Sequence, residues 1–272
     1  MINVLLTGDR NVFRGMTLCV LSIIKYTKVP VCFHIMTIGV HWADCEALSK
    51  EDFDRVYNVV KEKRPDCEMK YYDVSKSFIS HFEFSPNKKP VYSPASMTRL
   101  LLEESIKDVK RLIYLDCDTM AVSSLEAFNE LNIDEYEMAV SLDYMGHRWV
   151  KKDYFNSGVL YINMDMIKET KLFTNAIELL KKKKFFFADQ SALYECSSKL
   201  LYVPWRFNEQ RKIKADTVIK HFNKGIKKFP FMVYNVKQWN VKKVHSFLHI
   251  NYFDDIYEEY DKYFGEYAPL DY

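Results

Sequence analysis

Two carboxylates separated by a single residue stand directly after an apolar run in the middle of the chain. The segment RLIYLDCDTM has the pattern of a buried strand that ends in Asp116-Cys117-Asp118. Carboxylates just past a strand can converge on one cation at the carboxyl edge of a sheet, and their hard oxygen atoms favour Mg²⁺ or Mn²⁺ over zinc. The pair therefore predicts a divalent-metal site, with a helix cap or a turn without a ligand as the plainer alternatives.

A phosphatase alternative makes a different prediction about the spacing around these carboxylates. Haloacid-dehalogenase-like phosphatases also place two such Asp residues after an apolar run, followed by a Thr two residues beyond the second. Here Thr119 comes one residue too early, and Met120 occupies that place. In those phosphatases the motif usually opens the domain, whereas this pair lies in the middle of the chain. Both observations disfavour the phosphatase interpretation.

Polar residues also follow the first apolar run and interrupt a later helical pattern. Asp9 and Asn11, in TGDRN, could hydrogen-bond a base or ribose at a nucleotide-binding sheet edge, or could form an ordinary Asx turn. Arg99 stands between Met97 and Leu100 in an apolar segment, which indicates either a ligand contact or a surface ion pair.

Two further segments combine short polar groups with apolar runs. In FNSGVLYIN, Asn156 and Ser157 offer hydrogen bonds and Gly158 allows a close approach of the backbone, although a tight turn into a strand would use the same residues. Asp189 and Gln190 open a helical pattern, where the Asp could contact a ligand or simply cap the helix.

A histidine, a glycine and a lysine follow in KHFNKGIKKF. A neutral imidazole at His221 could complete the metal site, while the amide of Gly225 and the amine of Lys227 could neutralise phosphate oxygens. His245 and His249 are competing histidines, and neither has a lysine at the same spacing.

Taken in order, these segments resemble glycosyltransferase family 8, the retaining enzymes that include glycogenin and the bacterial lipooligosaccharide galactosyltransferases. The similarity spans residues 2–229. It implies a GT-A type, Rossmann-like nucleotide-diphospho-sugar transferase fold, with a mixed, mostly parallel sheet flanked by helices. It also implies a UDP-glucose or UDP-galactose donor, a Mn²⁺ or Mg²⁺ ion, and a glycan, glycolipid or protein acceptor.

The resemblance assigns a role to each matched residue. Asp116, Asp118 and His221 would bind the metal, and Gln190 with Asp189 would shield one face of the reacting sugar. The donor-binding residues would be Thr7, Asp9, Asn11, Arg99, Asp116, Cys117, Asn156, Ser157, Asp189, Gln190, Gly225 and Lys227. A sugar-1-phosphate nucleotidyltransferase and a non-catalytic nucleotide-sugar-binding module stay open as alternatives.

The chain departs from the family pattern in two places. The family form after the histidine is close to H-[YF]-x-G-x-x-K-P-W, whereas here the glycine comes one position late, and Lys228 and Phe229 replace the Pro and Trp. The position after Asn11, often a Tyr that stacks on the base, is Val12, for which Phe13 could substitute.

Short apolar runs alternate with helical patterns along most of the chain. This alternation predicts an α/β fold with a mostly parallel sheet, where ligands bind at the carboxyl ends of the strands. Residues 1–230 are expected to form the catalytic domain, and the aromatic-rich residues 231–272 a helical appendage. The predicted strands are residues 2–7, 31–38, 69–74, 111–116, 138–143 and 158–163.

Composition narrows the partners and the compartment. A net charge of +2 makes nucleic acid a poor partner, and no apolar stretch approaches the roughly 20 residues of a membrane span. Six scattered cysteines suggest a reducing compartment. We expect a cytoplasmic protein that binds a nucleotide sugar and is at most peripheral at the inner face of the membrane. The run of lysines at 181–184 follows an amphipathic pattern, which is typical of a solvated helix end.

Overall fold

The computed structural model describes residues 1–227, the last of these through its backbone only, and residues 232–272. Its central feature is a seven-stranded mixed sheet with the order β3-β2-β1-β4-β7-β6-β8. The strands in chain order are β1 Ile2–Gly8, β2 Val31–Thr37, β3 Glu68–Asp73, β4 Arg111–Asp116, β5 Thr119–Ala121, β6 Met138–Leu142, β7 Phe155–Asn163, β8 Leu200–Tyr202, β9 Ile219–His221, β10 Gly225–Lys227 and β11 Met232–Tyr234.

Parallel pairing dominates the sheet, as the sequence predicts. Strand β1 pairs in parallel with β2 and β4, β2 with β3, and β6 with β8, whereas β7 runs antiparallel to both β4 and β6. Strands β1 and β2 are mostly apolar and almost wholly buried, as expected for strands with helices on both faces of the sheet. Two small antiparallel pairs, β5 with β9 and β10 with β11, stand outside this sheet.

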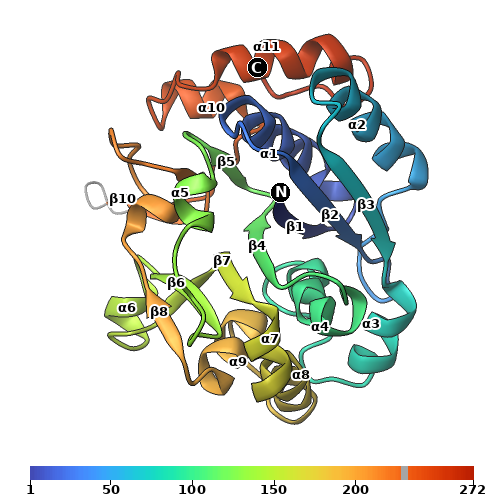
Figure 1. The fold of residues 1–272 in the computed structure, drawn as a ribbon, viewed down its shortest axis with the longest axis vertical. Coiled ribbons are helices and arrows are strands. Elements are labelled where there is room, and N and C mark those ends of the chain that lie inside the picture. The colour runs from blue at the N-terminus through green and yellow to red at the C-terminus, as the bar shows by residue number, and fades with distance from the viewer. Residues whose placement is uncertain (228–231) are drawn as a thin grey trace.

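Helices form a layer on each face of the sheet (Figure 1). Buried residues of α1, α2 and α11 pack against one face, and those of α3, α8 and α9 against the other. The α-helices are α1 Phe13–Tyr26, α2 Lys50–Lys63, α3 Ser75–Phe82, α4 Leu102–Ser105, α5 Glu126–Asn129, α6 Gly146–Trp149, α7 Met164–Thr170, α8 Leu172–Lys182, α9 Ala188–Cys196, α10 Val241–Ser246 and α11 Asp254–Phe264.

Local signals explain where several of these elements begin. Helix α2 starts at a capping box in which Ser49 and Asp52 bond each other's backbone amides. The segment that contains Arg99 is a 3₁₀ helix, Pro94–Leu101, that leads into α4. Strand β7 begins at Phe155, three residues earlier than predicted, because β6 continues to pair with it beyond a register shift at Val140 and Ser141.

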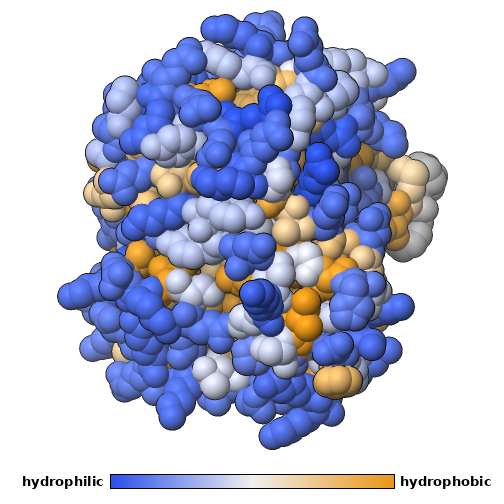
Figure 2. Space-filling view, turned by 90° about the vertical axis from the view of Figure 1, so that its right-hand side faces the viewer, coloured by the Kyte–Doolittle hydropathy of each residue, from blue (hydrophilic) through white to orange (hydrophobic). Residues whose placement is uncertain are grey.

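The C-terminal residues fold back onto α1. The ring of Phe13 makes edge contacts with Phe264 and Tyr267, and Arg14 donates a hydrogen bond to the carbonyl of Pro269. In Figure 1, α10 and α11 lie beside α1 at the upper edge of the molecule. The face shown in Figure 2 carries a band of hydrophobic residues at mid-height, between hydrophilic parts above and below.

No helix within residues 1–227 and 232–272 combines the length and the apolar character that a membrane span requires.

Candidate active site

A cavity of about 780 Å³ opens at the carboxyl ends of β1 and β4. Its walls come from these strand ends, from the first residues of β7, from the start of α9 and from the β10–β11 hairpin. The structure thereby brings together most of the residues that the sequence singles out: Thr7, Arg99, Asp116, Cys117, Asp118, Asn156, Ser157, Asp189, Gln190, His221 and Gly225.

Two carboxylates and an imidazole form the polar centre of this cavity. Asp116 is the last residue of β4, and the antiparallel pairing of β5 with β9 places His221 opposite Thr119. Nε2 of His221 lies 3.1 Å from Oδ1 of Asp118 and 3.9 Å from Oδ2 of Asp116. One ligand atom from each side chain falls within 4.8 Å of the others, which is close enough for all three to hold one ion.

A chain of hydrogen bonds fixes the imidazole of His221. Its Nδ1 lies 3.0 Å from Oδ1 of Asn208, whose Nδ2 in turn donates to Oδ1 of Asn156 at 2.9 Å. Because the amide oxygen of Asn208 can only accept a hydrogen bond, Nδ1 of His221 must carry a proton. Nε2 therefore points towards the carboxylates, the orientation found when a second partner positions a metal-binding histidine.

Arg99 holds one oxygen of Asp116 and leaves the other facing His221. Its guanidinium is 3% exposed, donates to Oδ1 of Asp116 at 2.7 Å and lies 3.2 Å from Oδ2 of Asp189. It also donates to the carbonyl of Ser157 and lies 4.3 Å above the ring of Tyr114, whose hydroxyl donates to the same Oδ1.

Burial and charge act in opposite directions on these groups. Burial alone would lower the pKa of Arg99, but the carboxylates of Asp116 and Asp189 raise it, so the guanidinium stays charged. Burial raises the pKa of Asp189, and Arg99 opposes this only in part.

Asp118 has an unexpected partner in Lys237. The ammonium of Lys237 donates to Oδ2 of Asp118 and to the carbonyl of Phe222. Burial would raise the pKa of Asp118, but Lys237 and His221 more than offset it and hold that pKa well below its usual value. A positive charge thus already stands beside the carboxylate that the sequence assigns to a cation.

The donor set and its surroundings fit a divalent cation. Carboxylate oxygens and a neutral imidazole nitrogen suit Mn²⁺ or Mg²⁺, and each ligand is oriented by a second partner. The ammonium of Lys237 shows that the site favours a cation beside Asp118.

Gly158 allows this cluster to form. A Cβ atom there would lie 2.3 Å from Cε1 of His221 and 2.6 Å from Oδ2 of Asp116, distances that no packed side chain tolerates. The glycine is required for close approach, as its place in the FNSG segment suggests.

Helix α9 presents its first turn to the same cavity. Oε1 of Gln190 accepts hydrogen bonds from the backbone amide and the hydroxyl of Ser157, at 3.1 and 3.3 Å. Asp189 lies inside the helix and pairs with Arg99, so the alternative in which it caps the helix is wrong.

Several residues that the sequence singles out stand elsewhere. The carboxylate of Asp9 accepts a hydrogen bond from the amide of Asn11, which is the Asx-turn alternative, and another from the hydroxyl of Ser93. Among the described residues, neither Asp9 nor Asn11 lines the cavity. Phe13 is buried against α11, so it cannot replace the stacking Tyr, whereas Val12 does line the cavity. The side chain of Lys227, together with Lys228 and Phe229, lies outside the described residues.

The competing histidine His245 pairs with Asp254 at 2.7 Å on the C-terminal helices. Within the described residues, neither it nor His249 lines the cavity.

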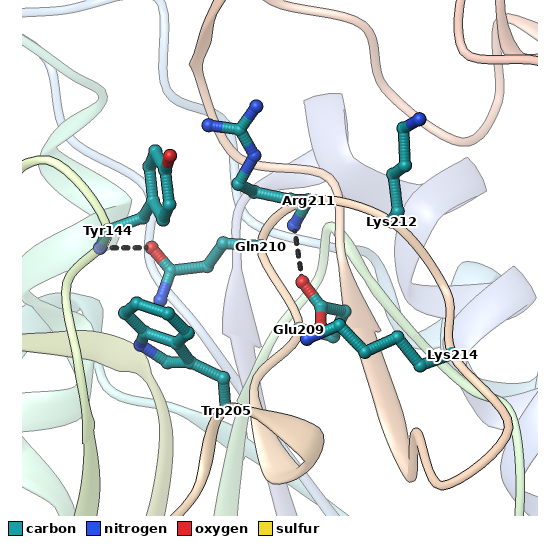
Figure 3. Close-up of a pocket in the computed structure, with 7 residues that line it drawn as sticks. All are labelled: Tyr144, Trp205, Glu209, Gln210, Arg211, Lys212 and Lys214. Carbon is teal, nitrogen blue, oxygen red and sulfur yellow. Dashed lines mark hydrogen bonds and ion pairs between the residues drawn. The ribbon is translucent and has the colours of Figure 1, made fainter.

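A second pocket, of about 200 Å³, adjoins the first (Figure 3). The rings of Tyr144 and Trp205 lie on either side of the Gln210 carboxamide, with their centroids 5.7 Å apart. Oε1 of Gln210 accepts from the amide of Tyr144 at 2.9 Å and from Nδ2 of Asn223 at 3.2 Å, and Asn223 lines the larger cavity. The two pockets therefore share a wall.

Comparison with known proteins identifies the family. The profile described as Glycosyl transferase family 8 matches residues 3–227, which include the whole cluster around Asp116. The chain belongs to glycosyltransferase family 8. It is 25% identical over 265 residues to a Haemophilus influenzae protein assigned to the glycosyltransferases, with 91% of this chain and 76% of that protein covered.

Solved structures agree on the fold. An active-site mutant of LgtC superposes with a TM-score of 0.69 at 15% identity, over 94% of both chains. The glycosyltransferase GlyE of Streptococcus pneumoniae gives a TM-score of 0.66 at 15% identity, over 96% of this chain and 64% of that one. These neighbours show the GT-A architecture, and membership of the family makes the protein a glycosyltransferase.

Sequence reasoning overlooked Lys237, Asn208 and Asp143. Lys237-Gln238-Trp239 keeps the lysine and tryptophan spacing of the family's K-P-W ending, and Lys237 and Trp239 line the cavity. This signal was available in the sequence, but the β10–β11 hairpin separates it from His221. Asp143, which accepts from Nδ2 of Asn156 at 2.8 Å, lies 13 residues from its partner and has no local signature.

Proposed function

We propose that this protein transfers glucose or galactose from a UDP-sugar, with retention at the anomeric carbon, to a glycan, glycolipid or protein acceptor. One observation carries the proposal: Asp116 and Asp118 converge within 4.8 Å with His221, which comes from a distant part of the chain, beside the ammonium of Lys237. In this proposal the three residues hold Mn²⁺ or Mg²⁺. The bound ion would neutralise the charge that develops on the diphosphate leaving group.

The residues around the metal ligands have complementary tasks. Arg99 orients Asp116, since it binds Oδ1 and leaves Oδ2 facing His221. Asn208 holds the imidazole of His221 so that Nε2 points towards the carboxylates. Both positions are set before a donor arrives, so little reorganisation would be needed when it binds.

We assign to Lys237 the phosphate-binding role that sequence spacing gave to Lys227. The ammonium of Lys237 pairs with Asp118, and a diphosphate held beside that carboxylate would compete for the same ammonium. Transfer of this hydrogen bond to a phosphate oxygen would help the leaving group depart.

Gln190 and Asp189 would shield one face of the sugar. The carboxamide of Gln190 is anchored on Ser157 through its oxygen, and an amide is a poor nucleophile. We therefore favour attack by the acceptor from the same face as the leaving group over a covalent intermediate. LgtC, a structural neighbour, has been solved with donor and acceptor sugar analogues, which agrees with a cleft that holds both.

The acceptor would approach past residues 76–94 and 144–155. The pocket between Tyr144 and Trp205 offers two aromatic rings next to the donor cavity, and such rings stack on the apolar faces of sugars. We place an acceptor sugar there.

Release of UDP tests the proposed function. Wild-type protein is incubated with a panel of nucleotide sugars, with Mn²⁺ or with a chelator, and free nucleoside diphosphate is measured. We expect release from UDP-glucose or UDP-galactose that requires the metal. Asp118→Asn should lower the rate by at least about 100-fold. The control Asp108→Asn, at an exposed carboxylate, should leave it unchanged.

The alternatives give other products. A sugar-1-phosphate nucleotidyltransferase would release pyrophosphate or incorporate it, and a binding module would bind a UDP-sugar without turnover. Either result, or full activity of Asp118→Asn with Mn²⁺, would overturn the proposal.

A further inference from the structure

The mouth of the donor cavity gathers a large share of the exposed apolar side chains. Thirteen large hydrophobic side chains are exposed in the part of the chain that the structure describes, and six of them line this one cavity: Val91, Tyr92, Trp149, Val150, Phe186 and Val233. Trp149 is 79% exposed and Phe186 is 67% exposed. Exposed apolar groups that cluster in this way mark an interaction surface, unlike single ones scattered over a protein.

Three of the segments that carry these side chains also carry a concentration of positive charge. Residues 86–92, 148–152 and 182–187, called the rim segments below, contain eight Lys or Arg residues and no Asp or Glu. The whole chain has 39 basic and 37 acidic residues, so this excess is local. Lys183 pairs with Glu195 at 3.0 Å, which offsets one of the eight charges.

Specific contacts hold the rim segments in place. Asn87, which is buried, donates to the carbonyls of Leu180 and Lys183 at 2.7 Å and accepts from the amide of Phe185 at 2.9 Å. The rings of Tyr92 and Phe187 stack with centroids 6.2 Å apart. The first and third rim segments thus form one prearranged surface, although they are about 90 residues apart in the sequence.

The second rim segment is anchored to the same wall of the cavity. It begins in the short helix α6, whose Gly146 amide donates to Oδ1 of Asp143 at 2.6 Å. The ammonium of Lys151 lies 5.1 Å from the centroid of the Tyr194 ring on α9. Trp149 is therefore held at the mouth by contacts of its neighbours with Asp143, which lines the cavity, and with α9.

The chemistry of the rim matches an anionic bilayer better than a sugar or a protein. Valine side chains neither stack on a sugar nor bind its hydroxyls, and the absence of acidic residues from the rim segments removes the usual partners of sugar hydroxyls. A Trp and a Phe among lysines are the combination that inserts into the headgroup region of negatively charged lipid. The lysine stems can lie along the lipid while their charges reach the phosphates.

We propose that the rim segments dock the protein on an anionic lipid bilayer, with the mouth of the donor cavity facing the membrane. In this orientation the acceptor is a glycan or headgroup on a lipid anchor that enters the cavity from the bilayer surface. The statement about the acceptor rests on the proposed function, whereas the docking does not.

Vesicle sedimentation tests the docking directly. The full chain is spun down with vesicles of phosphatidylcholine and phosphatidylglycerol, and with vesicles of phosphatidylcholine alone, without nucleotide sugar. We expect binding to the first mixture and much weaker binding to the second. Lys151→Glu with Lys152→Glu should lower the partition coefficient at least about tenfold. Trp149→Ser with Phe186→Ser should lower it by about tenfold.

A matched pair of lysines supplies the control. Lys242 and Lys243 on α10 are exposed neighbours that do not line the cavity, and their reversal to Glu should leave vesicle binding unchanged. Thermal melting followed by circular dichroism checks that every variant is folded. Equal binding of the wild type and both rim variants, equal binding to the two lipid mixtures, or no binding at all would overturn the proposal.

UDP release in the absence of vesicles separates this proposal from the proposed function. Lys151 and Lys152 are not among the described residues that line the cavity, so their reversal should leave that release at the wild-type rate. A protein that releases UDP but never binds vesicles would refute docking alone. A protein that binds anionic vesicles but releases no UDP would refute the transferase proposal alone.

Discussion

The base and the mouth of the cavity are built on opposite principles. At the base, Arg99 is 3% exposed and bonds two carboxylates, a carbonyl and an aromatic face. At the mouth, Trp149 is 79% exposed. Groups that must meet a developing charge gain from fixed positions, whereas groups that meet an external partner stay accessible until it arrives. The difference separates the residues expected to act on the donor from those expected to choose where the enzyme works.

Arg99→Met should break the base most severely. Removal of the guanidinium leaves the buried carboxylate of Asp189 and the partly buried carboxylate of Asp116 without their main partner. We expect the free energy of unfolding to fall by about 3–5 kcal/mol, measured by urea denaturation. The control Arg55→Met removes an exposed pair with Glu51 and should cost less than about 1 kcal/mol. Equal losses in the two variants would show that the base is not held by this network.

Lys237→Met should reduce turnover strongly while leaving the fold intact. The ammonium of Lys237 lies at Asp118, where the leaving group is proposed to bind. Loss of one such donor should lower kcat for UDP release by about 10²–10³-fold. Lys227→Met is the comparison, and a larger effect there would return the phosphate-binding role to the residue that sequence spacing favours.

Gly158→Ala tests how tightly the base is packed. The added methyl group would overlap both His221 and Asp116, so both side chains must move. We expect metal-dependent UDP release to fall by about 100-fold, because small displacements of reacting groups are costly. Gly39→Ala is the control, since its new Cβ also meets a close neighbour, the amide nitrogen of Ala47 at 3.1 Å, but neither His221 nor Asp116. Unchanged activity of Gly158→Ala would show that the cluster tolerates displacement.

Trp149→Ser should have the smallest effect on stability. Because the side chain is mostly in water, the free energy of unfolding should change by no more than about 0.5 kcal/mol in urea denaturation. A loss comparable to that of Arg99→Met would mean that the mouth is part of the folded core, and the contrast between the two regions would fail.

The sequence predicted the sheet well because its strands are buried on both faces. Runs such as residues 31–38 and 111–116 are mostly apolar, and they appear as β2 and β4 with nearly the predicted ends. Strand β7 is the exception. Asn156 and Ser157 look like a turn in the sequence, yet a register shift in β6 keeps them within the strand.

The sequence predicted the chemically distinctive residues of the candidate site but not the side chains that orient them. The candidate metal ligands Asp116, Asp118 and His221 were singled out from local motifs, and the structure brings the three together. The orienting bonds from Asn208 and Arg99 join residues 13 and 17 positions apart, on different elements, and no local pattern encodes them. Lys237 was missed because the motif was assumed to be continuous, whereas a hairpin interrupts it.

Binding of Mn²⁺ is the most direct test of the central claim, that Asp116, Asp118 and His221 form the metal site of a nucleotide-sugar transferase. Electron paramagnetic resonance records the sharp signal of free Mn²⁺ as protein is added, with and without UDP. The account predicts that the wild type with UDP removes this signal at one ion per chain, and that Asp118→Asn does not. Persistence of the free signal with wild-type protein and UDP, or equal loss of signal with Asp118→Asn, would contradict it.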